Sequence, residues 1–350
     1  MTSDLAKALK NDKASPNSLL SSGSSLLNLC CSGRVNGAIP KGAYVLFAGR
    51  TDSGKTWLAL QVLAEACASK QFADYEIHFD NAENGALMDI AHYFGKKLDE
   101  RMKIDHKSVY LEEFYDHLDD IIKRKVPFVY VLDSMDALVS KAAQKQYDKE
   151  KAARKSGDKV SGDYGTAKAK INSTSLPRIN AALQRSGSIL IIISQARDNI
   201  GIGAQFNPDT RAGGRALSFY AQMELWFKPI GELKRTVRKK ARQVGNISRI
   251  KVKRTRVTGR RRQIDLPIYH SFGVDDVGSC IDFLTEECHW TERDGKVDAK
   301  DFNFTGPKEK LIQKIEAEGL EKELRTLVAS LWNEIEQACQ IKRKRRYTYC

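Results

Sequence analysis

Long apolar runs are missing from this sequence: no window reaches the roughly 18 consecutive apolar residues that a membrane-spanning helix needs. The N-terminal stretch MTSDLAKALKNDK is polar and lacks the apolar core of a secretory signal. The seven cysteines are odd in number and form no C-x-x-C pair, which argues against a disulfide framework and a zinc ribbon. The six histidines show neither H-x-x-x-H nor H-E-x-x-H spacing, which disfavours a metalloenzyme. We therefore expect a protein of the reducing cytoplasm.

What is present is a globular composition whose positive charge is concentrated in one place. The 350 residues are 41% hydrophobic, 29% charged and 8% aromatic, which predicts a folded chain of about two domains. Lys and Arg number 58 against 44 Asp and Glu, a net charge of +14. Residues 228–262 alone hold 15 Lys and Arg against one acid, Glu232, so the rest is neutral overall. This is typical of a polyanion-binding protein, whereas the run at 342–346 is typical of a solvated tail.

Strands and helices alternate from about Leu26 onward. Continuous apolar runs predict buried strands at 44–48, 128–132 and 188–193, with a further strand at 76–79. Helical periodicity follows the first strand at 57–68 and recurs in an amphipathic stretch at 111–122. This alternation predicts an α/β fold with a mainly parallel central sheet.

The remaining segments complete the expected organisation. Residues 1–25 read as a short helix at 5–9 and a flexible arm, and 26–275 as the core. Later strands at 223–227, 249–257 and 263–268 are expected to be antiparallel or edge strands. Residues 276–350 are expected to form a small, mainly helical C-terminal domain with helices at 309–316 and 321–338.

A phosphate-binding motif follows the first buried strand. The pattern G-x-x-x-x-G-K-[ST] is met in every fixed position by Gly49, Arg50, Thr51, Asp52, Ser53, Gly54, Lys55 and Thr56. In such a loop the glycines let backbone N–H groups surround a phosphate, and the helix N-terminus adds positive potential. Lys55 is expected to reach the β- and γ-phosphates, and the Thr56 hydroxyl to hold Mg²⁺. The motif predicts a nucleoside triphosphate site.

Acidic residues end two of the predicted strands. Asp133 closes the strand at 128–132, where a phosphate-loop ATPase places its second magnesium ligand. ATP hydrolysis also needs a carboxylate that orients the attacking water. Glu83 is the candidate for this role and Asp80 is its rival, since both follow the strand at 76–79.

A long glycine-rich segment follows the strand at 188–193. Gln195 lies at the strand end, where a polar amide can sense the γ-phosphate. Segments as long as 196–215 are usually functional. Its arginines and glycines suit a phosphodiester chain, and its aromatic residue is suited to stacking. The residues concerned are Arg197, Phe206, Arg211, Gly213, Gly214 and Arg215.

At this point a family resemblance is clear. The run ISQARDNIGIGAQFNPDTRAGGRALSFYAQMELWF resembles the second DNA-binding loop and flanking strands of the RecA family of recombinases. The stretch LLNLCCSGRVNGAIPKGAYVLFAGRTDSGKT, together with SDLAKAL, is similar to the phage branch, the UvsX-like proteins. The resemblance covers roughly residues 25–290.

The resemblance implies a RecA-type phosphate-loop ATPase core, an N-terminal polymerisation arm and a small helical C-terminal domain. It implies that residues 49–56 bind ATP, Asp133 assists Mg²⁺, Glu83 is the catalytic carboxylate and Gln195 couples the γ-phosphate to DNA. Phe272 would lie against the adenine, while Arg254 and Arg256 would enter the neighbouring subunit's ATP site. The segment 155–165 resembles the first DNA loop. DNA contacts would come from Lys168, Arg178, Arg197, Phe206, Asn207, Arg211, Gly213, Gly214 and Arg215.

Three departures accompany the resemblance. The chain reads Asp80-Asn-Ala-Glu83, one residue longer than the Asp-Ala-Glu of the bacterial family. Leu87 and Ile90 occupy the positions of polar adenine contacts, which leaves base selectivity open. Arg replaces Lys at both positions expected to act on the neighbouring subunit, and Arg can still clamp phosphate.

The sequence thus predicts an ATP- and Mg²⁺-dependent recombinase, located in the bacterial host cytoplasm if it is encoded by a phage. It would form helical filaments on single-stranded DNA and exchange strands with a homologous duplex. Single-stranded-DNA-binding and loader proteins are further candidate partners. A hexameric helicase with the same core fold and a non-catalytic recombination mediator are the alternatives.

Overall fold

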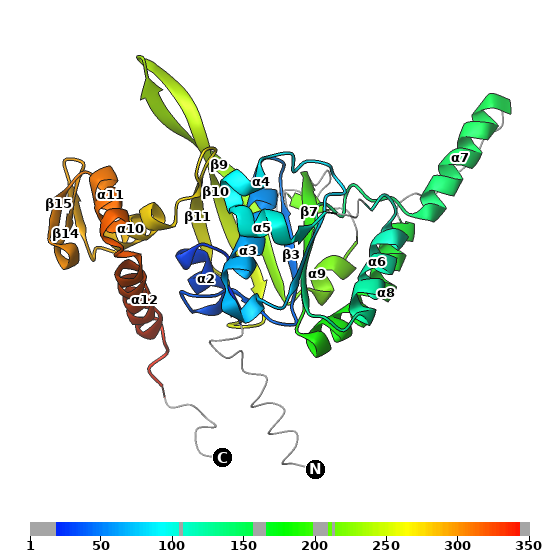
Figure 1. Cartoon of the computed structure of the whole chain (residues 1–350), viewed down its shortest axis with the longest axis horizontal. Coiled ribbons are helices and arrows are strands. Elements are labelled where there is room, and N and C mark those ends of the chain that lie inside the picture. Colours follow the sequence, from blue (N-terminus) through cyan, green and yellow to red (C-terminus); the bar gives the residue numbers. More distant parts are fainter. Residues whose placement is uncertain (1–18, 105–107, 157–165, 199–208, 212–213, 344–350) are drawn as a thin grey trace, which may run out of the picture. The chain divides into compact units, whose positions relative to one another are not determined.

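The computed structural model describes residues 19–104, 108–156, 166–198, 209–211 and 214–343. The chain divides into two compact units, the first ending at Val274 and the second beginning at Asp275 (Figure 1). Within the described residues, no helix is long and apolar enough to cross a membrane. All six cysteines whose placement is described are free thiols.

A large sheet forms the centre of the first unit. Its strand order is β12-β11-β10-β9-β3-β7-β6-β4-β5, and β8 pairs with β7. The parallel part consists of β3 (Tyr44–Gly49), β4 (Glu76–Asp80), β5 (Met102–Lys103), β6 (Phe128–Leu132) and β7 (Ile189–Asp198). Every residue of β3 and β6 is buried, as the continuous apolar runs require. The predicted α/β fold with a mainly parallel sheet is confirmed.

The other part of the sheet is mainly antiparallel. It consists of β9 (Met223–Val237), β10 (Lys240–Thr255), β11 (Gln263–Tyr269) and β12 (Gly273–Val274). The expectation that 223–227 forms an antiparallel or edge strand holds for its pairing with β10 but is wrong for its pairing with β3. These residues pair in parallel with β3, and Met223, Leu225 and Phe227 are buried. The start of β9 therefore lies inside the sheet, between β3 and β10.

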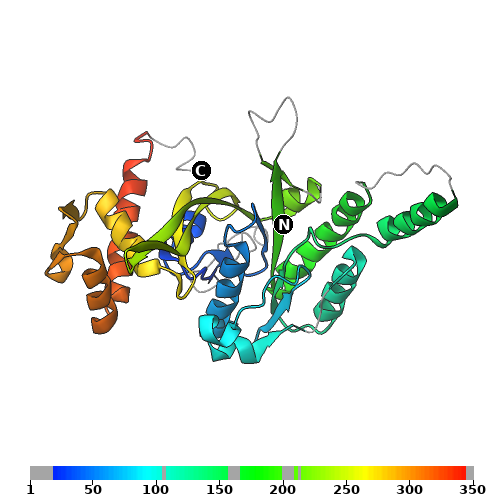
Figure 2. The ribbon, with the colours of Figure 1, turned by 90° about the horizontal axis from the view of Figure 1, so that it is seen from above.

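Helices cover both faces of the parallel strands. Figure 2 shows α3 on one side of the sheet and α6 and α8 on the other. One buried cluster joins α6, α8 and α9 to alternate residues of β3, β6 and β7, such as Tyr44, Tyr130 and Leu190. The helices are α3 (Lys55–Ala68), α4 (Ile90–Phe94), α5 (Lys96–Arg101), α6 (Leu111–Lys123), α7 (Lys141–Ser156), α8 (Thr166–Ser186) and α9 (Ala216–Tyr220), with the 3₁₀ turn η2 (Lys70–Phe72).

Only part of the predicted N-terminal arm falls within the described residues. The helix predicted at 5–9 lies outside them. From residue 19 onward the chain forms β1 (Leu19–Leu20), α2 (Ser25–Ser32) and β2 (Ile39–Pro40), and β1 pairs with β2. All eight residues of α2 are buried, so this segment packs onto the first unit.

The second unit combines helices with a small sheet. Its helices are α10 (Asp276–Glu286), α11 (Lys308–Glu318) and α12 (Glu321–Ala338), with the 3₁₀ turn η3 (Lys300–Phe302). The helix predicted at 321–338 is confirmed, and the one predicted at 309–316 lies within α11. A three-stranded antiparallel sheet was not predicted; its strands are β13 (Thr291–Arg293), β14 (Lys296–Ala299) and β15 (Phe304–Gly306).

The amphipathic helix α6 offers a direct test of the first unit's core. Phe114 is fully buried in the cluster under α6 and α8. We expect Phe114→Ala to lower the free energy of unfolding by about 3–5 kcal/mol, because it leaves a cavity. The matched control is Phe272→Ala, since Phe272 is exposed. Urea denaturation of both variants measures the difference, and equal losses would contradict the assignment.

Candidate nucleotide-binding site

The predicted phosphate loop joins β3 to α3. Gly49 ends β3, and a side chain there would collide with the backbone of Phe227 in β9. Gly54 immediately precedes α3 with a φ of +79°, and a Cβ there would press on Ile268 of β11. Both glycines are therefore required. Gly49 is required by close strand packing, and Gly54 by close packing and by its left-handed backbone conformation.

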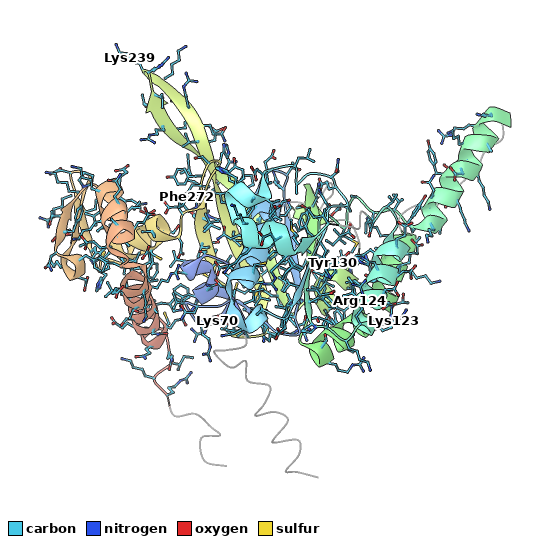
Figure 3. All side chains as sticks on the ribbon, in the orientation of Figure 1. Lys70, Lys123, Arg124, Tyr130, Lys239 and Phe272 are labelled. Atoms are coloured by element: carbon cyan, nitrogen blue, oxygen red, sulfur yellow. The ribbon has the colours of Figure 1, made fainter. Side chains whose placement is uncertain are left out.

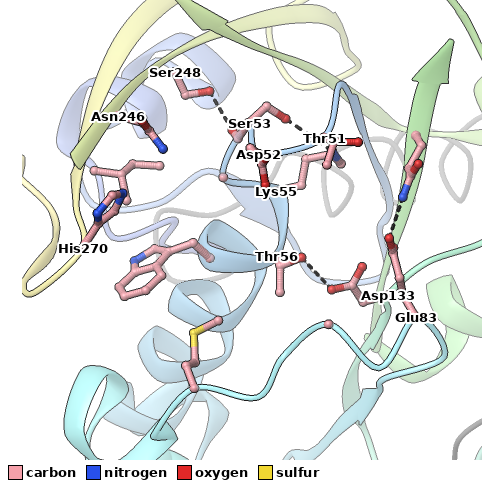
Figure 4. Close-up of a pocket in the computed structure, with 16 residues that line it drawn as sticks. Thr51, Asp52, Ser53, Lys55, Thr56, Glu83, Asp133, Asn246, Ser248 and His270 are labelled. Atoms are coloured by element: carbon pink, nitrogen blue, oxygen red, sulfur yellow. Dashed lines mark hydrogen bonds between the residues drawn. The ribbon is translucent and has the colours of Figure 1, made fainter. Parts of the chain in front are cut away.

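A pocket of about 340 Å³ opens beside this loop (Figure 4). Loop residues 51–56 line it, whereas Gly49 and Arg50 lie outside the lining. Lys55 is buried, and its Nζ donates to the Arg50 carbonyl oxygen at 2.6 Å and to Ser53 Oγ at 3.3 Å. Burial lowers the pKa of Lys55, and the nearby carboxylates of Asp133 and Glu83 oppose this shift. The loop thus holds a buried amine at the pocket.

Asp133 and Thr56 meet at the base of the pocket. Thr56 Oγ1 donates to Asp133 Oδ2 at 2.6 Å, joining α3 to the end of β6 (Figure 4). Asp133 is only 2% exposed, and burial raises its pKa to about 6 although Thr56 and Lys55 act in the opposite direction. A hydroxyl and a carboxylate oxygen are ligands that Mg²⁺ accepts, so this pair fits the predicted metal role.

Glu83 reaches the pocket and Asp80 does not. Glu83 lines it, with Oε2 accepting from Ser134 Oγ at 2.8 Å and Oε1 accepting from Gln195 Nε2 at 2.6 Å. Asp80 is 1% exposed and its carboxylate is occupied by Ser108 and Tyr130. Of the two candidates left open by the sequence, the geometry favours Glu83.

Gln195 stands at the junction of this site with the long loop. It pairs with Gly49 in the β3–β7 register, and its backbone N–H donates to Asp136 Oδ2 at 2.7 Å. The next residues do not form a free loop, because Ala196 to Asp198 pair with β8 (Asp209–Arg211) in an antiparallel ladder. The segment read as one flexible loop therefore has a β-stem.

The pocket lining also contains residues that the motifs did not indicate: Trp57, Met88, Asn246, Ile268 and His270. Asn246 and Ile268 carry no motif signal, because β10 and β11 reach the loop only through the sheet order.

Ser248, also in the lining, secures the phosphate loop. Its Oγ donates to the carbonyl oxygen of Ser53 at 2.8 Å. Phe272 is 63% exposed and outside the lining, whereas His270 lies within it. β11 ends at Tyr269, and Phe272 lies in the turn before β12, so its expected contact with the adenine stays a prediction. Leu87 is also exposed, at 79%.

The predicted DNA-binding residues are only partly described. Phe206, Asn207 and Gly213 lie outside the described residues, as does 157–165 of the first loop. Arg197 and Arg211 lie on the two opposite strands of the β-stem. They occupy adjacent register positions and are not paired with each other. Gly214 has a φ of +79°, and its missing side chain would collide with Ala169 of α8. The end of the second loop therefore packs against the helix that follows the first, and the next residue, Arg215, is exposed.

Two cations of α8 are already engaged within the chain. Lys168 Nζ donates to the Leu138 carbonyl oxygen at 2.8 Å. Arg178 forms an ion pair with Asp119 of α6, which raises the pKa of the guanidinium. Lys168 lies in the first turn of α8, near the first loop, whereas Arg178 is three turns further along. Their role in binding DNA stays a prediction.

Arg254 lies near the end of β10, and Arg256 immediately follows that strand. Arg254 donates to the carbonyl oxygen of Ser218 and, at 3.4 Å, to that of Phe219. Arg256 is exposed. Neither residue lines the pocket of its own chain. Their expected action on a neighbouring subunit's nucleotide stays a prediction.

A mainly parallel sheet with a phosphate loop between β3 and α3 defines the class of phosphate-loop α/β proteins. A family model described as the RecA N-terminal domain matches residues 5–275. The chain belongs to the RecA family.

Three relatives, each called Protein RecA, show the extent of the similarity. That of Nitrobacter winogradskyi is 30% identical over 279 residues, covering 78% of this chain and 68% of the relative. That of Caulobacter vibrioides is 31% identical over 248 residues, covering 70% and 63%. That of Cytophaga hutchinsonii is 28% identical over 260 residues, covering 71% of this chain and 64% of the relative, less than two thirds of its length.

The raised pKa of Asp133 has a consequence for stability. Because its pKa is about 6 in the folded protein and 3.8 ordinarily, the folded state binds the proton more tightly. The favourable contribution is therefore full below pH 3.8 and is lost as the pH rises through about 6. Asp133→Asn keeps an acceptor for Thr56 but cannot titrate. Without nucleotide, we expect the free energy of unfolding of this variant, relative to that of the wild type, to increase by about 1 kcal/mol from pH 5 to pH 7.5. Urea denaturation at the two pH values measures this, and a pH-independent difference would contradict it.

Proposed function

We propose that this protein is an ATP-dependent homologous recombinase. It forms helical filaments on single-stranded DNA, pairs the bound strand with a homologous duplex and exchanges strands, hydrolysing ATP at subunit interfaces. The observation that carries the proposal is the 2.6 Å hydrogen bond between Gln195 and Glu83. This bond joins the candidate catalytic carboxylate to the residue from which the β-stem of the second loop begins.

The pocket fits a magnesium nucleoside triphosphate. Residues 51–56 surround the space where a phosphate chain would lie, with the buried amine of Lys55 among them. Thr56 and Asp133 present two oxygens at one point, suited to Mg²⁺, which would neutralise charge on the β- and γ-phosphates. Trp57 and His270 also line the pocket and provide flat side chains on which a base can stack. We propose ATP as the nucleotide.

Glu83 and Gln195 together provide a switch. Glu83 accepts two hydrogen bonds that hold its carboxylate at the pocket, where it can orient a water for attack on the γ-phosphate. The amide of Gln195 is a donor that can serve either Glu83 or a γ-phosphate oxygen. Turning to the phosphate would free Glu83 for the water and shift the start of the second loop. ATP binding and loop position are then coupled through one side chain.

The second loop and the helix after the first loop form a joint DNA surface. Gly214 packs on Ala169, so a displacement of one loop is transmitted to the other. Arg215 is exposed beside this contact. Backbone-directed binding by such cations has little sequence preference and weakens steeply with salt.

The finer assignment is to the phage-type, UvsX-like branch. It is supported by residues 26–56, whose α2, β2 and phosphate loop carry the stretch that resembles this branch. On this assignment the protein acts in the cytoplasm of a bacterial host, with single-stranded-DNA-binding and loader proteins as partners.

Glu83 is tested against Asp80 by isosteric substitution. We expect Glu83→Gln to keep ATP binding but to lower DNA-dependent ATP turnover by at least about 10²-fold. Asp80→Asn is the matched control: it loses buried hydrogen bonds, which lowers stability by about 1–3 kcal/mol, yet turnover stays near wild type. A phosphate-release assay and nucleotide titration measure both. If a folded Asp80→Asn variant loses ATP turnover while Glu83→Gln keeps it, Asp80 and not Glu83 is the catalytic carboxylate.

Action between subunits is tested by mixing two inactive variants. Arg254→Ala/Arg256→Ala should lower turnover by about 10³-fold or more, as loss of an arginine finger does. Mixed in equal amounts with Glu83→Gln, it should regain about a quarter of wild-type turnover, because one interface in four is then intact. No recovery in mixed filaments would refute action between subunits.

Electron microscopy decides between the classes of assembly. The protein is imaged on single-stranded DNA with a non-hydrolysable ATP analogue, and then without nucleotide. Long helical filaments that need nucleotide support the recombinase. Closed six-membered rings would support the hexameric helicase, and scattered monomers on DNA the mediator.

A further inference from the structure

A two-stranded basic ribbon extends beyond the sheet at the end of β9 and the start of β10 (Figure 1). β3 pairs with β9 only as far as Phe227, and β11 pairs with β10 only from Gly245 onward. Within the segment 233–244, here called the basic ribbon, residues 234–237 pair only with residues 240–243. Its four regular pairs run from Lys234↔Gln243 to Val237↔Lys240 and, at about 3.3 Å each, extend about 13 Å.

The charge on the basic ribbon is of one sign. Residues 233–244 contain six Lys and Arg and no acid. Lys234 is paired with Glu232 at 3.0 Å, just outside the segment. For the other five, the described residues show no ion pair; these are Arg235, Arg238, Lys239, Lys240 and Arg242, all exposed. Lys239 is labelled at the tip in Figure 3.

Two features make this arrangement unfavourable for the ribbon alone. Arg235 and Arg242 are directly opposed across the two strands, where like charges repel. Arg238 and Lys239 form the two-residue turn with φ of 50° and 63°, a conformation that favours Asn-Gly and not long side chains. Because neither feature helps folding, an anionic partner is the physical reason for such residues here.

The alternation of strands gathers the cations. Cross-strand pairs share a face, and every second pair lies on the same face. Arg235, Arg242 and Lys240 therefore lie on one face, with the turn cations at its end. A two-stranded ribbon fits the major groove of B-form DNA, about 12 Å wide, whose walls are rows of phosphates.

We propose that the basic ribbon enters a groove of double-stranded DNA and holds its phosphate backbone, at a site separate from the two loops. In the sheet order, β3 and β9 separate β10 from β7, which carries the second loop. Because β9 runs parallel to β3, the basic ribbon leaves the sheet at the edge where the phosphate loop lies. The inference rests on the proposed function only for naming the duplex as partner.

The ribbon is also rooted in the nucleotide pocket. Asn246 and Ser248, which follow it on β10, line the pocket, and Ser248 donates to the phosphate loop. Residues that line the pocket therefore follow the ribbon within a few positions on the same strand.

The test compares R235Q/K240Q/R242Q with the wild type. Equilibrium binding of labelled duplex and of single-stranded DNA of equal length is measured by fluorescence anisotropy over a salt series, with a non-hydrolysable ATP analogue. For duplex we expect the negative slope of log affinity against log salt to become less steep by about 2.7, which is about 0.9 for each of the three lost phosphate contacts. The affinity should fall by about one to two orders of magnitude near physiological salt. Single-strand affinity and single-strand-dependent ATP turnover should stay near wild type.

The control K70Q/K96Q/K97Q removes the same charge at exposed positions away from the ribbon, and Figure 3 shows Lys70 far from Lys239. A second variant replaces 234–243 by Asn-Gly and should lose duplex affinity as the triple variant does. Unchanged duplex affinity, equal loss for single strand, or equal loss in the control would overturn the proposal. If poly-glutamate binds the wild type but not the triple variant, and both bind duplex equally well, the partner of the ribbon would be an acidic protein and not DNA. If the wild-type protein shows no DNA-dependent ATP turnover, the proposed recombinase function is refuted. Duplex binding by the ribbon can still be measured in that case.

Discussion

The parallel register of β3 with β7 is the constraint on which the site depends. It sets Gly49 opposite Gln195, so the phosphate loop and the long second loop begin at the same edge of the sheet. β4 and β6 end at that edge too, where the backbone N–H of Glu83 donates to the Asp133 carbonyl oxygen at 2.8 Å. Four strands thus deliver a loop, two acids and an amide to one place. Parallel strands concentrate function at their carboxyl ends for this reason.

The site holds buried charged groups, and its chemistry follows from that. Burial opposes the charged forms of both Lys55 and Asp133, and each is partly compensated by the other. A triphosphate with its metal would complete this balance, because it supplies anions to the amine and a cation to the carboxylate.

The antiparallel half of the sheet extends the site beyond the phosphate loop. β10 contributes Asn246 and Ser248 to the pocket, the basic ribbon at its start and Arg254 at its end. One strand therefore runs from the candidate duplex site, past the pocket, to the residue held by the carbonyls after the second loop.

The sequence by itself determined the features that are local. A fixed spacing of Gly, Lys and Thr defines the phosphate loop, and continuous apolar runs such as 128–132 define strands buried on both faces. Only the tertiary structure decided what depends on distant pairing. Asp80 and Glu83 look equivalent in the chain, but Ser108 and Tyr130 occupy Asp80. His270 lies in the pocket lining although no motif indicated it, whereas Phe272, two residues further along, does not line the pocket. Residues 223–227 are interior because β3 lies beside them, a neighbour some 180 residues earlier that no local pattern encodes.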